Sequence, residues 1–307
     1  MNKAMCKGGA VFAAVLAATS AMGINVWAKG AELNVAYQYG LAYAPVMVAM
    51  ERGLIEEAYK DETGKELKIS WNQMAGGADI NTGFASGDLD VGFIGIGPGV
   101  TGVVKGVGYK IFSNISGQAH EIMSNDKEIQ KVADMIGTDK QMALVNIGSY
   151  QHILLAMALA ADGEDPHALD SNLIAMKHPD GMTALQTGTV AAQLTTNPYI
   201  YMEQKDDSLH QVGELEDVWS SDHSFIVGIA SEELHDNDPK LYNAVCSGIS
   251  DAIDYINDNP EETAELTAEL DGNSKEDELE YLKKGTYSVE TKGVEEYAKF
   301  MYTNKLN

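Results

Sequence analysis

Four short loops of this chain combine glycine with small polar or aromatic side chains of the kind that hold a small anion. Each loop follows a predicted strand and precedes a predicted helix, where unpaired backbone N–H groups and the helix dipole favour negative charge. Because the loops offer hydroxyl, amide and backbone donors but no arginine fork, they predict binding of a small solute by neutral dipoles. The loops are 38–40 (Gln-Tyr-Gly), 95–97 (Gly-Ile-Gly), 147–151 (Ile-Gly-Ser-Tyr-Gln) and 195–199 (Thr-Thr-Asn-Pro-Tyr).

Twelve residues in and beside these loops are the candidate ligand contacts. Their side chains would hydrogen-bond the solute, their glycines would let the backbone approach it, and their tyrosine rings would form flat walls. The alternative is structural, since Ser149 fits a helix N-cap and a single tyrosine fits core packing. Recurrence of the loops in both halves of the chain favours a shared ligand site. The candidates are Gln38, Tyr39, Tyr43, Gly95, Ile96, Gly148, Ser149, Tyr150, Gln151, Thr196, Asn197 and Tyr199.

Catalytic and metal-binding patterns are weak in the sequence. Residues 97–102 match GxGxxG after a strand, but Pro98 lacks an N–H for a phosphate, so a packed helix is the better interpretation. His120 is expected to be buried with a hydrogen bond, whereas His152, in the first turn of a helix, could contact a ligand. No histidine spacing fits a metal site. The sequence therefore predicts no cofactor, no metal and no enzymatic activity.

Composition narrows the class of partner. The chain has 307 residues and a formal net charge of -25, and Arg52 is its one arginine. Such a chain is not expected to bind nucleic acid, because neutralising phosphates requires clustered lysine and arginine. Cys6 lies in the predicted leader, so Cys246 would be alone in the mature chain, without a disulfide or a cysteine-based zinc cluster.

Residues 1–28 are typical of a secretory signal peptide. Lys3 and Lys7 precede an apolar run at 10–21, and small residues flank Trp27 before a cleavage site near Ala28. An uncleaved membrane anchor is the alternative. No later segment approaches the roughly 20 apolar residues of a membrane span. The sequence therefore predicts an exported, periplasmic protein.

The elements that would position the loops occur twice. Residues 84–98 and 185–199 share one order: a helix ending at glycine, a strand, a turn, and a proline that opens another helix. Asp79 and Asp180 are expected to cap the two helices. Alternation of strands and helices predicts an α/β fold with largely parallel sheets. The predicted strands lie at 33–37, 68–71, 89–94, 109–115, 142–146, 173–176, 190–194 and 224–230.

The repeat predicts two similar lobes with a ligand between them. We expect residues 29–118 to begin lobe 1, residues 119–212 to form lobe 2, and residues 213–307 to complete lobe 1 with C-terminal helices. Two segments would then cross between the lobes, near Gln118 and Val212, and act as a hinge.

In order and spacing, several segments resemble the periplasmic substrate-binding proteins of ABC importers for nitrate, sulfonates and taurine, a branch that includes thiamine-precursor binders. The resemblance covers nearly all of the mature chain and implies a type II periplasmic-binding-protein fold, with two lobes closing over a ligand in a central cleft. The segments that carry it are 37–40 with the following helix, 85–92, 148–149 with the following helix, and 197–199.

The resemblance implies a function without catalysis. A monomer would capture a small anion or zwitterion, such as an aliphatic sulfonate, taurine or nitrate, and deliver it to an ABC permease. Asn197 stands where relatives often have an acidic residue, which removes a charge partner for a ligand amine. The alternatives are a binder of a thiamine pyrimidine precursor or an enzyme on the same fold, although Cys246 alone cannot form the cysteine-rich motif of such enzymes. A sensory protein would use the same cleft.

Overall fold

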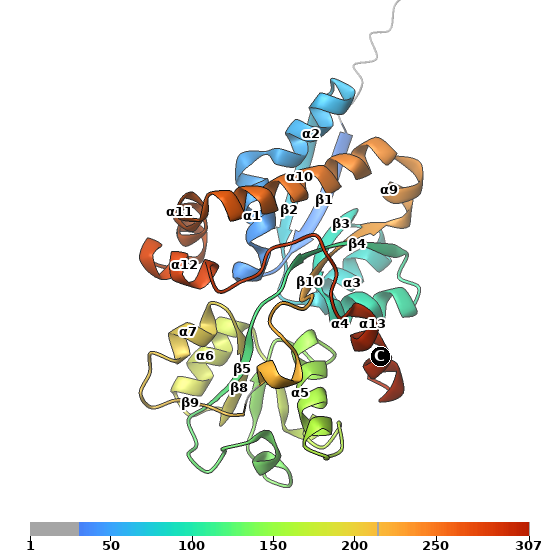
Figure 1. The fold of residues 1–307 in the computed structure, drawn as a ribbon. Coiled ribbons are helices and arrows are strands. Elements are labelled where there is room, and N and C mark those ends of the chain that lie inside the picture. Colours follow the sequence, from blue (N-terminus) through green and yellow to red (C-terminus); the bar gives the residue numbers. More distant parts are fainter. Residues whose placement is uncertain (1–30, 214, 307) are drawn as a thin grey trace, which may run out of the picture.

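The computed structural model describes residues 31–213 and 215–306. It contains two five-stranded sheets, each flanked by helices, arranged in two halves (Figure 1). The signal peptide predicted at 1–28 lies outside the described residues. The predicted α/β class is confirmed, since helices and strands alternate through both halves.

The first sheet has the strand order β2-β1-β3-β10-β4. Strands β1, β2 and β3 run parallel, and β10 runs antiparallel between β3 and β4. All five residues of β3 are buried, as expected for a central strand covered on both faces. The strands are β1 (Ala31–Tyr37), β2 (Leu67–Gln73), β3 (Val91–Gly95), β4 (Tyr109–Ser116) and β10 (Ile226–Ser231).

The second sheet repeats this arrangement, with the order β7-β6-β8-β5-β9. Strands β6, β7 and β8 are parallel, and β5 is the antiparallel neighbour of β8, as β10 is of β3. The duplicated unit predicted from the sequence therefore corresponds to two equivalent sheets. The strands are β5 (His120–Ser124), β6 (Met142–Leu144), β7 (Leu173–Ala175), β8 (Ala192–Thr196) and β9 (His210–Gln211).

Helices follow the strands in both halves. Gly53, with φ 64°, ends the helix that Pro45 opens and separates α1 from α2. Ser149 caps α5 as an N-cap should, because its hydroxyl accepts the backbone N–H of His152 at 3.3 Å. These helices are α1 (Ala44–Arg52), α2 (Leu54–Thr63), α3 (Gly77–Ser86), α4 (Ile96–Val104), α5 (Tyr150–Ala161), α6 (His178–Gln186), α7 (Tyr199–Glu203) and α8 (Leu215–Val218).

Two predicted helix caps are wrong. Asp79 and Asp180 lie inside the first turns of α3 and α6, and the N-cap positions belong to Gly76 and Lys177, whose backbones are extended. Both helices start three residues earlier than predicted. The acidic side chains remain well placed for the helix dipole, which favours negative charge in a first turn.

The C-terminal part of the chain is helical. Helix α10 packs along α1 and α2, while α13 packs against α4 at the boundary of the two halves (Figure 1). Within the described residues, no helix combines the length and the apolar character needed to cross a bilayer. The helices are α9 (Glu232–Asn237), α10 (Pro239–Asp258), α11 (Pro260–Asp271), α12 (Lys275–Leu282) and α13 (Val294–Thr303).

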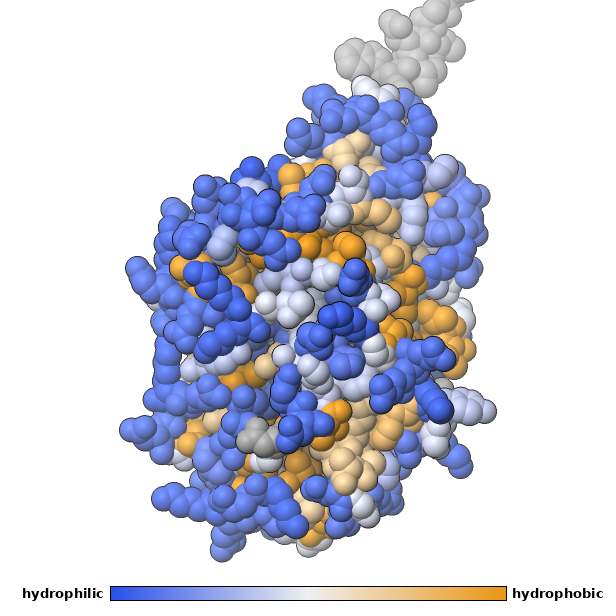
Figure 2. All heavy atoms as spheres, viewed as in Figure 1, coloured by the Kyte–Doolittle hydropathy of each residue, from blue (hydrophilic) through white to orange (hydrophobic). Residues whose placement is uncertain are grey.

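The chain passes between the sheets at 117–119 and returns between 212 and 225, and the segment 286–293 runs beside both passages. Gly117 exchanges backbone hydrogen bonds with Thr286 at 2.8 and 3.0 Å. A Cβ atom on Gly117 would lie 2.6 Å from the carbonyl oxygen of His223, so the passages are too close for a side chain there. Hydrophilic residues cover much of the face of the molecule seen in Figure 2.

Candidate functional site

A pocket lies where the carboxyl ends of strands from both sheets face each other. About 40 Å³ inside it is free to hold the centres of water molecules, and the space continues to solvent. Since one water needs roughly 10–15 Å³ of such volume, the pocket in this arrangement admits only a small solute. The lining residues are Gln38, Tyr39, Ala42, Tyr43, Ala75, Gly77, Gly95, Pro98, Val145, Asn146, Ser149, Tyr150, Gln151, Lys177, His178, Thr196 and Phe225.

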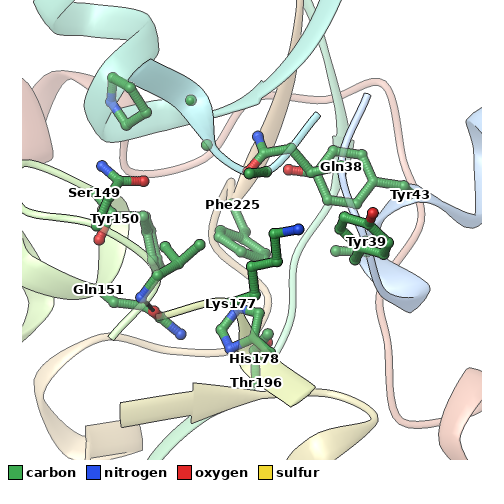
Figure 3. Close-up of a pocket in the computed structure, with 17 residues that line it drawn as sticks. Gln38, Tyr39, Tyr43, Ser149, Tyr150, Gln151, Lys177, His178, Thr196 and Phe225 are labelled. Atoms are coloured by element: carbon green, nitrogen blue, oxygen red, sulfur yellow. Dashed lines mark hydrogen bonds between the residues drawn. The ribbon is translucent and has the colours of Figure 1, made fainter. Parts of the chain in front are cut away.

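Eight of the twelve candidate residues line this pocket. In Figure 3, residues from the end of β1 approach from one side and residues from the start of α5 approach from the other, with Lys177 extending into the space between them. The structure thus brings the candidates of both halves together, while their contact with a ligand stays a prediction. The eight are Gln38, Tyr39, Tyr43, Gly95, Ser149, Tyr150, Gln151 and Thr196.

Three other candidates lie outside the lining of this pocket, and their contact with a ligand stays a prediction. The backbone N–H of Ile96 donates to the carbonyl oxygen of Phe225 at 2.9 Å and is therefore engaged within the protein. Gly148 lies on a neighbouring groove, and its N–H donates to His152 Nδ1 at 3.1 Å. The ring of Tyr199 stacks on that of His178, with centroids 5.4 Å apart, and so supports a lining residue.

The fourth, Asn197, also lies outside the lining, and its contact with a ligand stays a prediction. Its side chain is fully buried, and its amide nitrogen donates to Gln118 Oε1 at 2.9 Å and to the Tyr281 carbonyl oxygen at 2.7 Å. Gln118 belongs to the passage between the sheets, and Tyr281 belongs to α12. Asn197 therefore joins the end of β8 to the connecting region.

We predict that Asn197→Ala lowers the free energy of unfolding more than it affects ligand binding. The substitution removes two buried hydrogen bonds and leaves Gln118 Oε1 without its donor, whereas the Tyr281 carbonyl oxygen still accepts the N–H of Lys284 at 3.1 Å. The expected cost is about 1–3 kcal/mol. Urea unfolding would measure the loss, with the exposed Asn243 on α10 changed to alanine as the control. Unchanged stability combined with a tenfold loss of affinity would contradict this role for Asn197.

Several lining residues were not predicted from the sequence. Lys177 and His178 follow the end of β7, and Pro179 opens the first turn of α6. The rule used for the other loops, a polar turn between a strand end and a proline-initiated helix, would have found them. Phe225 enters the pocket from the returning passage, and no local pattern marks it.

The electrostatics of the pocket differ from those of the whole chain. Among the lining residues described, none is aspartate or glutamate, and Lys177 is the one lysine. Its ammonium lies 5.7 Å from the centre of the Tyr39 ring, so a side chain of the second half faces one of the first. Arg52 is engaged elsewhere, with its guanidinium 4.0 Å from the centre of the Tyr255 ring. In a protein with net charge -25, this lining favours an anion.

Three polar atoms of lining residues are buried and have no hydrogen-bond partner among the described residues: Gln151 Nε2, Asn146 Oδ1 and His178 Nδ1. Gln151 is held in place because its Oε1 accepts the N–H of Val145 at 3.1 Å. Burial lowers the pKa of His178 to about 4, so its ring is neutral at neutral pH. Unpaired buried groups cost about 1–3 kcal/mol each, which a bound solute or water would offset.

An aromatic cluster forms the inner wall of the pocket. Tyr150 lies 4.7 Å from both Phe225 and His120, centre to centre, and stacks on Tyr297 at 5.4 Å. Burial lowers the pKa of His120 to about 3, and its Nδ1 lies 3.1 Å from the Gln118 carbonyl oxygen. The predicted burial of His120 is therefore confirmed. Rings from four segments thus meet behind the pocket.

His152 does not line the pocket. Its Nδ1 accepts the N–H of Gly148, and its Nε2 lies 3.1 Å from Asp170 Oδ1, so the ring holds the loop from behind. Within residues 31–213 and 215–306, no cluster of three or more potential ligand side chains could hold a metal ion. The site offers hydrogen bonds, aromatic walls and one cation.

The fold is that of periplasmic binding proteins. The periplasmic aliphatic sulphonate binding protein SsuA from Escherichia coli aligns with a TM-score of 0.69 over 90% of this chain and 93% of its own, at 21% identity. The alkanesulfonate-binding protein SsuA from Xanthomonas axonopodis pv. citri, bound to MOPS, aligns with a TM-score of 0.73 over 90% and 94%, at 18% identity.

Sequence comparison points in the same direction. The taurine-binding periplasmic protein of Escherichia coli (strain K12) is 24% identical over 230 residues, which cover 75% of this chain and 68% of that protein. The NMT1-like family matches residues 28–270. Because this match spans both sheets and most of the chain, the expected relationship is confirmed: the protein belongs to the NMT1-like family.

Proposed function

We propose that this chain is the solute-binding component of an ABC importer, which captures a small anion between two lobes and delivers it to a membrane permease. The observation that carries the proposal is the pocket lining, whose described residues include Lys177 and no carboxylate, in a strongly acidic protein. Relatives that bind taurine or aliphatic sulphonates in the periplasm support it. The protein would act without catalysis, as a periplasmic monomer whose leader is removed near Ala28.

Capture would follow from closure of the lobes. We take residues 29–118 and 213–307 as one lobe and residues 119–212 as the other, joined by the passages near Gln118 and Val212. A ligand that contacts both lobes binds the closed state better than the open one and therefore shifts the population toward closure. Lys177 of one lobe lies over the ring of Tyr39 of the other, so a ligand beside these two side chains would contact both lobes.

Within the pocket, the charged head of the ligand would lie near Lys177 and the free amide N–H of Gln151. Tyr39 and Tyr43 would add hydroxyl groups from the other lobe, and Phe225 would pack against an apolar part of the ligand. No bidentate arginine clamp takes part, because Arg52 stacks on Tyr255 outside the pocket. The proposed ligand is thus held mainly by neutral donors and one lysine.

The absence of carboxylates from the described lining also selects among anions. The ammonium group of taurine would enter the pocket without an acidic partner, and an unpaired buried charge is strongly unfavourable. Alkanesulfonates, which carry no amine, avoid this cost. We therefore infer that the ligand is an anion without an amine, and that the pocket binds an aliphatic sulfonate more tightly than taurine.

The test is a thermal-shift series with alkanesulfonates, MOPS, taurine, nitrate, sulfate and a thiamine pyrimidine. A ligand present at one hundred times its dissociation constant stabilises the folded state by about 2.7 kcal/mol. We expect ethanesulfonate or a longer homologue to raise the melting temperature, and taurine to raise it less. The proposed ligand class would be contradicted if the pyrimidine were the only compound to raise the melting temperature, or if none of the anions raised it.

A further inference from the structure

A continuous row of hydrogen bonds leads from the loop at 147–151 to the C-terminal tail, by which we mean α13 and the residues that follow it to 306. The N–H of Gly148 donates to His152 Nδ1 at 3.1 Å, and His152 Nε2 lies 3.1 Å from Asp170 Oδ1. The other oxygen of Asp170 lies 2.8 Å from His167 Nδ1. His167 Nε2 lies 2.8 Å from the carbonyl oxygen of Asn304, just after α13. Two histidines and one carboxylate therefore join the loop to the tail.

The partners of each ring set its protonation. His152 Nδ1 accepts a backbone N–H and so carries no proton, which leaves Nε2–H to donate to Asp170. Both nitrogens of His167 face acceptors, a carboxylate and a carbonyl oxygen. Both contacts are hydrogen bonds only when both nitrogens carry protons. This geometry therefore requires His167 as the imidazolium cation.

The tail that His167 holds contacts both halves of the molecule. Helix α13 packs on α4, and Tyr297 stacks on Tyr150, with its hydroxyl 3.3 Å from the Tyr150 carbonyl oxygen. Leu306 is buried and lines a groove together with Thr101 and Lys105 of the first half and Ile147 of the second. The tail thus supports the pocket wall at Tyr150 and the loop that contains Ile147.

We propose that protonated His167 acts as a latch that fastens the C-terminal tail to the second half and thereby stabilises the closed arrangement of the pocket. Deprotonation removes one of its two hydrogen bonds, either the bond to Asp170 or the bond to the Asn304 carbonyl, and so breaks the link between the tail and the second half. The consequence for solute affinity rests on the proposed function, whereas the latch itself is a property of the protein without ligand.

The charges around His167 give the direction of the pH dependence. The Asn304 carbonyl and then Asp170 raise the pKa of His167 above its usual 6.5, and Asp165 adds a smaller contribution. Partial burial opposes ionisation of Asp170, but hydrogen bonds from His152 and His167 outweigh it and lower the pKa of that carboxyl. Because the folded state raises the pKa of His167, the latch contributes fully below pH 6.5 and is lost as pH rises through the raised value.

Hydrogen exchange of the ligand-free protein tests the latch. In His167→Asn, the side-chain amide can still donate to Asp170 but is too short to reach Asn304. At pH 5.5 we expect this variant to exchange its amides at 300–306 roughly fivefold or more faster than the parent, the effect of losing a partly screened hydrogen bond to a charged group. At pH 9, after correction for intrinsic rates, the two proteins should exchange alike. The matched control is His235→Asn, which removes a histidine paired with Asp236 on α9.

Equal exchange of parent and His167→Asn at pH 5.5 would overturn the latch, whatever the protein binds. If the latch holds, His167→Asn should also weaken binding of ethanesulfonate at pH 5.5 by about threefold or more, with little difference at pH 9. Altered exchange with unaltered affinity would overturn the coupling of the tail to the pocket. Loss of all anion binding in the parent would instead contradict the proposed function and leave the exchange result standing.

Discussion

Lys177→Glu is expected to lower the affinity for an anionic ligand by about 100-fold, and Lys177→Gln by about tenfold. A hydrogen bond from a charged donor contributes about 1.5–3 kcal/mol, and the exposure of Lys177 places it at the low end. Glutamate adds repulsion in a pocket whose described lining residues include no other carboxylate. Isothermal titration with the best sulfonate from the thermal-shift series would measure both losses.

The control is Lys240→Glu on α10, which makes the same change of net charge on an exposed part of the chain outside the pocket. It should leave the affinity within about twofold, since charges beyond a Debye length of about 8 Å are largely screened at physiological salt. Equal effects of the two substitutions would mean that the pocket responds to overall charge. No effect of Lys177→Glu would place the anion away from Lys177.

Tyr150→Ala is expected to lower the free energy of unfolding by about 3–5 kcal/mol and to abolish measurable ligand binding. Tyr150 is 2% exposed, and its ring contacts His120 and Phe225 and stacks on Tyr297. Removing the ring leaves a cavity where the passages, α5 and α13 meet. Urea unfolding followed by tryptophan fluorescence would report the change, because Trp219 packs edge-on against Tyr297.

Tyr150→Phe, which keeps the ring, should retain most of that stability. Tyr302→Ala provides the surface control, because Tyr302 is on the same helix as Tyr297 but is 78% exposed. A loss below about 1 kcal/mol in Tyr150→Ala would show that the surrounding rings close the gap by themselves. Binding at parental affinity in that variant would rule out Tyr150 as part of the pocket wall.

Local sequence patterns predicted the strands and helices because each depends on neighbours in the chain. The hydroxyl of Ser149 accepts the backbone N–H of His152, only three residues later, so the N-cap of α5 could be predicted from sequence. Pro45 and Gly53 mark the ends of α1 for the same kind of reason. The loops at strand ends followed from topology, because parallel strands bring their carboxyl ends to one edge.

Local patterns could not predict which side chains of those loops face the pocket and which form hydrogen bonds within the protein. Asn197 lies in a predicted binding loop, yet its amide bonds to Gln118 and Tyr281, which are 79 and 84 residues away in the chain. The entry of Phe225 into the pocket depends on how the returning passage packs. Lys177 and His178 lie in a polar turn between a strand and a proline-initiated helix, which is a local signal that the sequence does contain.

The amino-acid sequence by itself determined the α/β class, the two equivalent halves, the acidic surface and the edge of each sheet where a ligand would lie. Hydrophobic periodicity, glycine and proline are local signals, and they specify helices, strands and turns independently of contacts with distant segments. Only the tertiary structure decided which loop residues face the pocket, that the described lining includes Lys177 and no carboxylate, and that His167 meets the Asn304 carbonyl 137 residues later. Those outcomes depend on contacts between distant segments, whose geometry is set by the packing of the whole molecule.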